Sequence, residues 1–325
     1  MIGLLVALIP PLARSKQQAP QIVRIDGSST VFPITDAIAQ EYNRVNDQDI
    51  QVKTGISGTG GGFKKFCAGE TDINDASRPI TEDEMKACDR AGIRFYELPI
   101  AFDALTVVVN PQNTWANDIT VEELKKVWEP AAQGKITNWK QIRPSYPDKP
   151  LRLFGPGRDS GTFDYFTEVT VGKDDSRTDY VASEDDNTLV QGVRQDPNAL
   201  GYFGYAYYEA NQNQLKALAI DNGNGAILPT RETVEKAQYQ PLSRPLFIYV
   251  NYKSAQDKPE VVTFTRFYLE NAKRLVNSVG YIPLPDEGYH LADVHFTVGK
   301  VGTVFAGQPQ PNLTIGALLR KQKAF

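Results

Sequence analysis

A short run of residues near the middle of the chain combines the groups that bind oxyanions. Residues 157–163 (GRDSGTF) place an arginine, two hydroxyl side chains and a glycine around the start of an expected helix, Thr162 to Thr170. The start of a helix offers unpaired N–H groups and the positive end of the helix dipole. An arginine adds a planar fork that matches two oxygens of an anion. The run therefore predicts a site for a phosphate-like anion.

Two further loops have the same character. They are residues 27–30 (GSST) and residues 55–62 (GISGTGGG), and each follows a short apolar segment and precedes a helix-like one. Loops rich in glycine and serine are common turns, so one of them alone would mean little. Three of them in the same strand–loop–helix setting predict one shared anion site.

The length and charge of the chain narrow the classes of function. Its 325 residues are enough for about two domains, and 41% of them are hydrophobic, which allows ordinary cores. The 35 basic and 39 acidic residues leave a formal net charge of −4. This balance argues against a nucleic-acid surface driven by bulk charge. Any attraction for an anion must therefore be local to its site.

The opening stretch, Met1 to Pro11, is apolar but too short to span a bilayer, which needs about 20 apolar residues. We expect it to be the apolar part of an export signal, although positive residues do not precede it. A disordered tail or a strand is the alternative. Export would place the protein in the periplasm, either free or associated with the membrane.

Cys67 and Cys88 are the only cysteines of the chain. In an exported protein we expect them to form a disulfide, which would add about 3 kcal/mol to the stability. The alternative is two buried thiols. Two cysteines alone make no structural zinc site, and the only histidines, His290 and His295, are remote in the sequence. We expect neither a metal nor a cofactor.

The pattern of apolar residues predicts an α/β fold. Strand-like segments at Val23–Asp26, Ile50–Lys53 and Arg94–Leu98 alternate with helix-like ones, of which Val31–Asn46 is the first. Thr81 with Glu84, and Thr120 with Glu123, have the spacing of capping boxes. Strands that alternate with helices predict a mainly parallel sheet with helical crossovers.

Two buried-strand runs, Ala104–Asn110 and Leu246–Val250, bracket the middle of the chain. This layout is expected if the chain leaves one domain, builds a second and returns. The predicted organisation is a residual signal or disordered segment at 1–20, a discontinuous first domain at 21–105 and 245–325, and a second domain at 106–244. The anion would then bind between the domains, at the carboxyl ends of strands.

With these loops in place, the chain resembles the phosphate-binding component of the phosphate-specific ABC importer. The resemblance runs from about Val23 to the C-terminal region. It rests on the order and spacing of five stretches: 26–33 (DGSSTVFP), 55–65 with its SGTG core, 76–79 (ASRP), 158–162 (RDSGT) and 199–202 (ALGY).

The resemblance implies two α/β domains of the type II periplasmic-binding-protein class, with a hinge and a ligand cleft between them. It implies inorganic phosphate as ligand and the membrane permease of an ABC importer as partner. It also implies a receptor that is not an enzyme, and we expect a monomer. Carried over by position, the phosphate ligands are Ser29, Thr30 and Val31; Ser57 or Thr59; Ser77; and Arg158, Ser160, Gly161 and Thr162. Asp159 would orient Arg158.

One position departs from the pattern. Some relatives carry an aspartate where this chain has Ser77. That carboxylate accepts the proton of hydrogen phosphate and repels a fully ionised anion such as sulfate. Asp75 is the nearest substitute acceptor, unless it is a helix-cap or surface residue. A receptor for another tetrahedral oxyanion, sulfate or arsenate, therefore stays an alternative, as does a phosphate-ester hydrolase. Arg78, beside the loop, is expected to form an ion pair rather than to bind the ligand.

Overall fold

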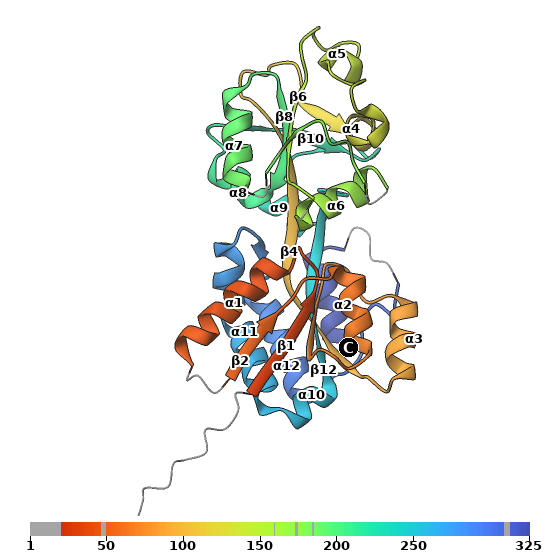
Figure 1. Ribbon diagram of the computed structural model, residues 1–325, viewed down its shortest axis with the longest axis vertical. Helices are drawn as coiled ribbons and strands as arrows, with labels where there is room; N and C mark the ends of the chain where they lie inside the picture. Colours follow the sequence, from red (N-terminus) through yellow and green to blue (C-terminus); the bar gives the residue numbers. More distant parts are fainter. Residues whose placement is uncertain (1–20, 47–49, 159, 173–174, 184, 309–312) are drawn as a thin grey trace, which may run out of the picture.

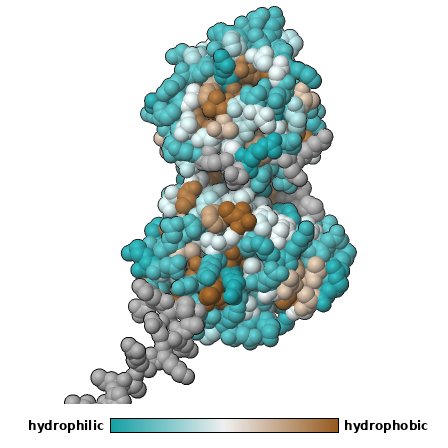
Figure 2. Space-filling model, in the orientation of Figure 1, coloured by the Kyte–Doolittle hydropathy of each residue, from teal (hydrophilic) through white to brown (hydrophobic). Residues whose placement is uncertain are grey.

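The computed structural model describes residues 21–46, 50–158, 160–172, 175–183, 185–308 and 313–325. The protein has two lobes stacked along its long axis and joined by two long strands (Figure 1). The space-filling view shows the same two bodies with a narrow waist between them (Figure 2). This is the expected two-domain arrangement of a periplasmic binding protein. Among the described residues, no helix is both long and apolar enough to cross a membrane.

The first lobe, the lower one in Figure 1, contains both the N-terminal and the C-terminal described segments. Its strands are β1 (Gln21–Gly27), β2 (Ile50–Thr54), β3 (Ile73–Ala76) and β13 (Ile282–Pro283). Its helices are α1 (Phe32–Val45), α2 (Gly58–Cys67), α3 (Glu82–Arg90), α10 (Tyr252–Asp257), α11 (Pro259–Ser278), α12 (Asp286–Val298) and α13 (Ile315–Ala324).

The second lobe is built from the middle of the chain (Figure 1). Its strands are β5 (Asp118–Thr120), β6 (Arg152–Gly155), β7 (Val181–Ala182), β8 (Ala199–Gly204), β9 (Lys216–Ala217), β10 (Ala219–Asp221) and β11 (Ala226–Ile227). Its helices are α4 (Val121–Trp128), α5 (Trp139–Ile142), α6 (Gly161–Thr170), α7 (Asp186–Gln195), α8 (Tyr205–Ala210) and α9 (Arg231–Glu235), with a 3-10 turn at Pro130–Ala132.

The two lobes share one sheet, in the order β2-β1-β3-β12-β4-β8-β6-β7. Strands β1, β2 and β3 pair in parallel, as expected for strand–helix–strand units, and so do β6, β7 and β8. The prediction of a mainly parallel sheet is wrong for its centre. There β12 (Ser243–Asn251) is antiparallel to both β3 and β4 (Phe95–Val109), and β4 is antiparallel to β8. Two central strands that carry the chain out of the first lobe and back must run in opposite directions.

These two strands form the connection between the lobes. The sequence indicated separate strands on the two sides of Pro99, but β4 is continuous and buried along its whole length. The register of β4 with β12 shifts between Leu246 and Phe247, opposite Pro99. Such an irregularity accommodates a proline, which cannot donate to the strand ladder. The predicted domain boundaries at 105/106 and 244/245 fall within β4 and β12, and this division into folding domains stays a prediction.

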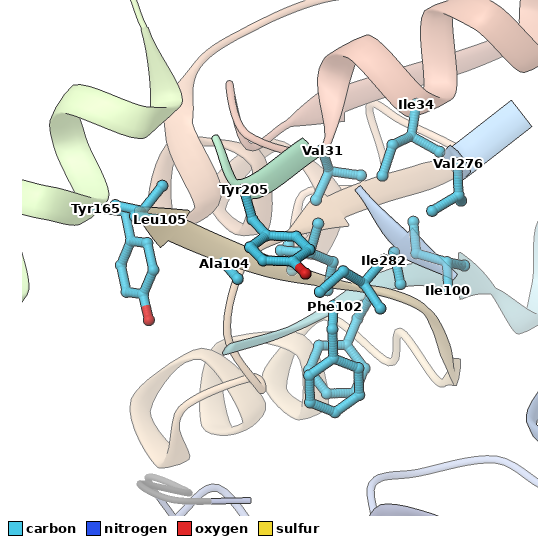
Figure 3. Packing of buried hydrophobic residues seen from close by; sticks show 14 of the residues in the cluster. Val31, Ile34, Ile100, Phe102, Ala104, Leu105, Tyr165, Tyr205, Val276 and Ile282 are labelled. Carbon is cyan, nitrogen blue, oxygen red and sulfur yellow. The ribbon is translucent and has the colours of Figure 1, made fainter. Parts of the chain in front are cut away.

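The hydrophobic core follows β4 from one lobe into the other (Figure 3). Val31 and Ile34, at the start of α1, lie over the first-lobe part of this strand, near Ile100. Tyr165 and Tyr205 contribute from the second lobe. One apolar cluster therefore extends along β4 through both lobes.

Local signals in the sequence set several helix starts. Thr81 accepts from the Glu84 backbone and Thr120 from the Glu123 backbone, so both predicted capping boxes are confirmed. The predicted disulfide is also present, because Cys67 at the end of α2 is bonded to Cys88 in α3. It ties together the two helices that follow the second glycine-rich loop.

Candidate functional site

The first loop turns the chain from β1 into α1. Gly27 has a φ of +142°, and a Cβ there would lie 2.2 Å from the Asp75 carbonyl oxygen, so only glycine fits. The hydroxyl of Ser28 accepts from the backbone N–H of Thr30 at 3.2 Å and of Val31 at 3.4 Å. The N–H groups of Thr30 and Val31 are thus bonded to a neutral hydroxyl. A charged oxyanion is a stronger acceptor and is able to replace it.

The second loop starts helix α2. Ser57 is its N-cap residue, but the Ser57 hydroxyl hydrogen-bonds to Asp26 rather than to the helix, and Lys65 pairs with the same carboxylate at 2.6 Å. The first four N–H groups of a helix have no partner within it, and here they belong to residues 58–61. Glycines at three of these four positions leave the amides unobstructed by side chains.

The hydroxyls of Thr59 and Ser77 lie close together at the N-terminus of α2. Their Oγ1 and Oγ atoms are 3.0 Å apart, and the Ser77 backbone N–H donates to Thr59 Oγ1 at 3.2 Å. Next to them Arg78 makes two hydrogen bonds of 2.9 Å to Glu84, so the predicted ion pair is confirmed. Both Ser57 and Thr59 line the same pocket, but their hydroxyls have different partners.

Asp75 is not the substitute acceptor considered for Ser77. Its carboxylate is buried behind the first loop and accepts a 2.9 Å hydrogen bond from Thr35 of α1. Burial, reinforced by the charge of Asp26 and opposed by the bond from Thr35, raises the pKa of Asp75 to about 8. Asp75 is therefore an interior group, neither a helix cap nor a surface residue.

The third loop starts helix α6 in the second lobe. Ser160 is its N-cap residue and accepts from the Thr162 backbone N–H at 3.2 Å. A Cβ on Gly161 would lie 2.4 Å from the Thr30 backbone nitrogen, so the two lobes touch at this glycine. The Thr30 hydroxyl donates to the Gly161 carbonyl at 3.2 Å, and the Ser29 hydroxyl donates to Asp164 at 3.2 Å.

Two pockets adjoin this contact, one lined by Thr30 and the other by Gly161. We call the larger one, of about 520 Å³, the arginine pocket, and its lining residues are Ser28, Ser29, Thr30, Ser57, Gly58, Thr59, Gly60, Gly61, Ser77, Arg78, Asp164, Glu168 and Arg244. We call the other, of about 360 Å³, the tyrosine pocket. It is lined by Ser29, Phe32, Pro33, Ile56, Asp103, Ser160, Gly161, Thr162, Asp186, Gly204, Tyr207, Val279, Gly280 and Tyr281.

The structure therefore brings together most, but not all, of the predicted ligands. The hydroxyls of the first two loops and of Ser77 line the arginine pocket, whereas the start of α6 lines the tyrosine pocket. The side chain of Arg158 lines neither pocket. It is 55% exposed and pairs with Asp175 at 2.6 Å. Asp159 lies outside the described residues.

The sequence reasoning missed Arg244. This residue begins the buried run of β12 and lines the arginine pocket, where its Nη2 donates to Thr30 Oγ1 at 2.9 Å. Asp164 and Glu168 of α6 also line this pocket and were not predicted. No local motif marks Arg244, although a charged residue at the start of an apolar strand is a signal that could have drawn attention to it.

Comparison with known proteins places this chain in a family. Residues 14–272 match the family described as the PBP superfamily domain. The chain is 54% identical to the protein SphX of Synechocystis, over 100% of this chain and 97% of the relative. It is 38% identical to the phosphate-binding protein PstS of Staphylococcus saprophyticus, over 82% of each chain.

A solved structure resembles the whole fold. The crystal structure of a possible phosphate binding protein from Planctomyces limnophilus matches with a TM-score of 0.81 and 44% identity. The match covers 87% of this chain and 100% of that protein. The chain therefore shares its fold with the Planctomyces limnophilus protein over the entire length of the latter.

Proposed function

Because this chain belongs to the PBP superfamily, among the relatives of SphX and the PstS phosphate-binding proteins, we propose that it binds inorganic phosphate between its lobes and delivers it to the permease of an ABC importer. The observation that carries the proposal is that three helix starts lie around two pockets between the lobes, both of which are lined by Ser29. Helices α1 and α2 approach these pockets from the first lobe and α6 from the second, and all three begin in loops of glycine and hydroxyl residues.

The proposed ligands come from these three starts. The first loop offers the N–H groups of Ser29, Thr30 and Val31 and the hydroxyls of Ser29 and Thr30. The second offers the amides of residues 58–61 with Ser57 or Thr59, and Ser77 beside them. Helix α6 offers Ser160, Gly161 and Thr162. Hydrogen bonds to a charged partner contribute about 1.5–3 kcal/mol each, so several of them support micromolar or tighter binding.

Arg158 would join the ligand set by a change of partner. Its guanidinium is exposed. Within the described residues, the one ion pair that it forms is with Asp175. An exposed ion pair of this kind contributes at most about 1 kcal/mol, so exchange for a phosphate oxygen costs little. Asp175 is the carboxylate that the exchange would release.

A receptor role fits the residues at the cleft better than ester hydrolysis does. Phosphatases rely on a metal cluster or an activated nucleophile. Neither pocket is lined by a histidine or a cysteine among the described residues, and His290 and His295 lie in α12 of the first lobe. We accordingly propose that the protein is not an enzyme and that it acts in the periplasm.

Ser77 keeps a receptor for another tetrahedral oxyanion as the second candidate. The group at this place in the arginine pocket is a hydroxyl, which discriminates less strongly against sulfate than a carboxylate does. Calorimetric titration of the purified protein with phosphate, arsenate and sulfate at two pH values distinguishes the candidates. The proposal predicts micromolar or tighter binding of phosphate. Absence of heat and of retention at millimolar phosphate, or sulfate bound as well as phosphate, would contradict it.

A further inference from the structure

Arg244 occupies an unusual position, because it lies in the hinge and not in either anion-binding lobe. It is the second residue of β12, and its register partner across the strand pair is Asp103 of β4. These are the two strands that connect the lobes (Figure 1). The Arg244 side chain is only 13% exposed. The backbone of Arg244 therefore belongs to the strand pair that joins the lobes.

The contacts of Arg244 reach both lobes. From the first lobe, Thr30 Oγ1 accepts from Nη2 at 2.9 Å. From the second lobe, the ring of Tyr165 lies under the guanidinium at 3.6 Å, and the Glu168 carboxylate is 3.8 Å from Nη1. The Tyr165 hydroxyl is itself anchored to the Pro241 carbonyl at 2.6 Å, two residues before β12. The aromatic face therefore fixes the plane of the guanidinium.

Most of the hydrogen-bonding capacity of Arg244 is still available. A guanidinium has five N–H donors, and among the described residues one hydrogen bond, to Thr30, is made. The buried Nε has no hydrogen-bond partner there, since the Asp103 carboxylate is 3.6 Å away. The carboxylates of Asp103 and Glu168 compensate the charge of Arg244, but neither is close enough to accept a hydrogen bond from it. Arg78, the other arginine of the arginine pocket, differs because Glu84 already holds two of its donors.

We infer that Arg244 is an anion ligand of the arginine pocket and that it couples anion binding to the approach of the lobes. The inference rests on the proposed binding of phosphate. An anion at the starts of α1 and α2 would lie beside the Thr30 hydroxyl that Arg244 already contacts. It would take the free donors of the guanidinium and replace Glu168, which is 63% exposed, as the compensating charge. A planar guanidinium can donate to two oxygens of the same anion, which a point charge such as a lysine ammonium does not do.

The test measures phosphate binding and lobe closure in the full chain. Arg244→Gln keeps polar contacts and removes the charge, and Arg244→Lys keeps the charge and removes the fork. Because Arg244→Gln leaves Asp103 buried without its partner, the double variant Arg244→Gln/Asp103→Asn removes both charges and guards against misfolding. Arg231→Gln is the matched control, since Arg231 is half-exposed and pairs with Glu209 in the second lobe.

Calorimetry with inorganic phosphate should show at least tenfold weaker binding for Arg244→Gln and for the double variant, an intermediate loss for Arg244→Lys, and no change for the control. Small-angle scattering should show a phosphate-induced decrease in radius of gyration that is lost in both Gln variants. The melting temperature shows whether the double variant folds. If it folds and binds phosphate as the wild type does, the inference about Arg244 is overturned while the proposed function stands. A wild type that does not bind phosphate would overturn the proposed function as well.

Discussion

Thr30 and Gly161 lie in direct contact across the cleft, with the Thr30 hydroxyl 3.2 Å from the Gly161 carbonyl oxygen. One residue precedes α1 in the first lobe and the other begins α6 in the second. The loops that precede α1 and begin α6 therefore touch at this point. The absence of a side chain at residue 161 is what permits the contact.

A side chain at this point should weaken phosphate binding. In Gly161→Ala the new methyl group would meet the Thr30 nitrogen and Oγ1 at 2.4 Å, so the lobes would be held apart. We expect the phosphate affinity to fall by roughly tenfold or more, which corresponds to about 1.4 kcal/mol, with little change in melting temperature. Calorimetry and thermal unfolding measure the two effects. Gly316→Ala in α13 is the control, because Gly316 lines neither pocket and a Cβ there meets nothing closer than 3.5 Å. Equal affinities of the three proteins would show that this contact does not limit closure.

Ser77→Asp should increase the preference for phosphate over sulfate. The Ser77 hydroxyl lies 3.0 Å from Thr59 Oγ1 in the arginine pocket, so an aspartate would place a carboxylate near the anion. A carboxylate accepts the proton of hydrogen phosphate and repels sulfate. We expect the ratio of the two affinities to rise by roughly tenfold, or about 1.4 kcal/mol, in competition titrations. Ser77→Ala serves as the uncharged comparison. A ratio that stays flat in Ser77→Asp would mean that residue 77 is not near the proton of the ligand.

Asp75 should make the stability depend on pH. Its pKa in the folded protein is raised to about 8, mainly by burial, so the folded state holds a proton that the unfolded state releases near pH 4. The free energy of unfolding therefore falls as the pH rises from about 4 to about 8, by up to about 1.4 kcal/mol per unit. Asp75→Asn removes the titration while its amide oxygen can still accept from Thr35.

Urea unfolding of wild type and Asp75→Asn at pH 5 and pH 8 tests this expectation. The difference in the free energy of unfolding between the two proteins should shift in favour of the variant at the higher pH. A difference that is the same at both pH values would show that Asp75 does not titrate in this range.

The disulfide should contribute to stability with little effect on the site. Cys67 and Cys88 are 21 residues apart, and closing a loop of this length stabilises the folded state by about 3 kcal/mol in the chain-entropy view. Cys67→Ser/Cys88→Ser should lower the free energy of unfolding by about this amount. The chain has no other cysteine, so the wild type in reductant should behave like the variant. If the wild type is equally stable in oxidant and in reductant, the crosslink adds nothing.

The three anion loops were identifiable from the sequence because their chemistry is local. A helix start, its cap and its glycines are contiguous residues, so the loops before α1, α2 and α6 can be recognised as short sequence motifs. The capping boxes at Thr81 and Thr120 were predictable for the same reason, since the paired groups are three residues apart.

The tertiary structure alone decided that Arg244, and not Arg158, lines the arginine pocket. Arg158 lies within a predicted anion loop, yet its side chain pairs with Asp175, whereas Arg244 reaches Thr30 from 214 residues away. That placement depends on the register of β12 with β4, which sets Arg244 opposite Asp103 and directs its side chain toward the arginine pocket. Strand register between distant segments results from the packing of the whole sheet, and no local pattern in the sequence records it.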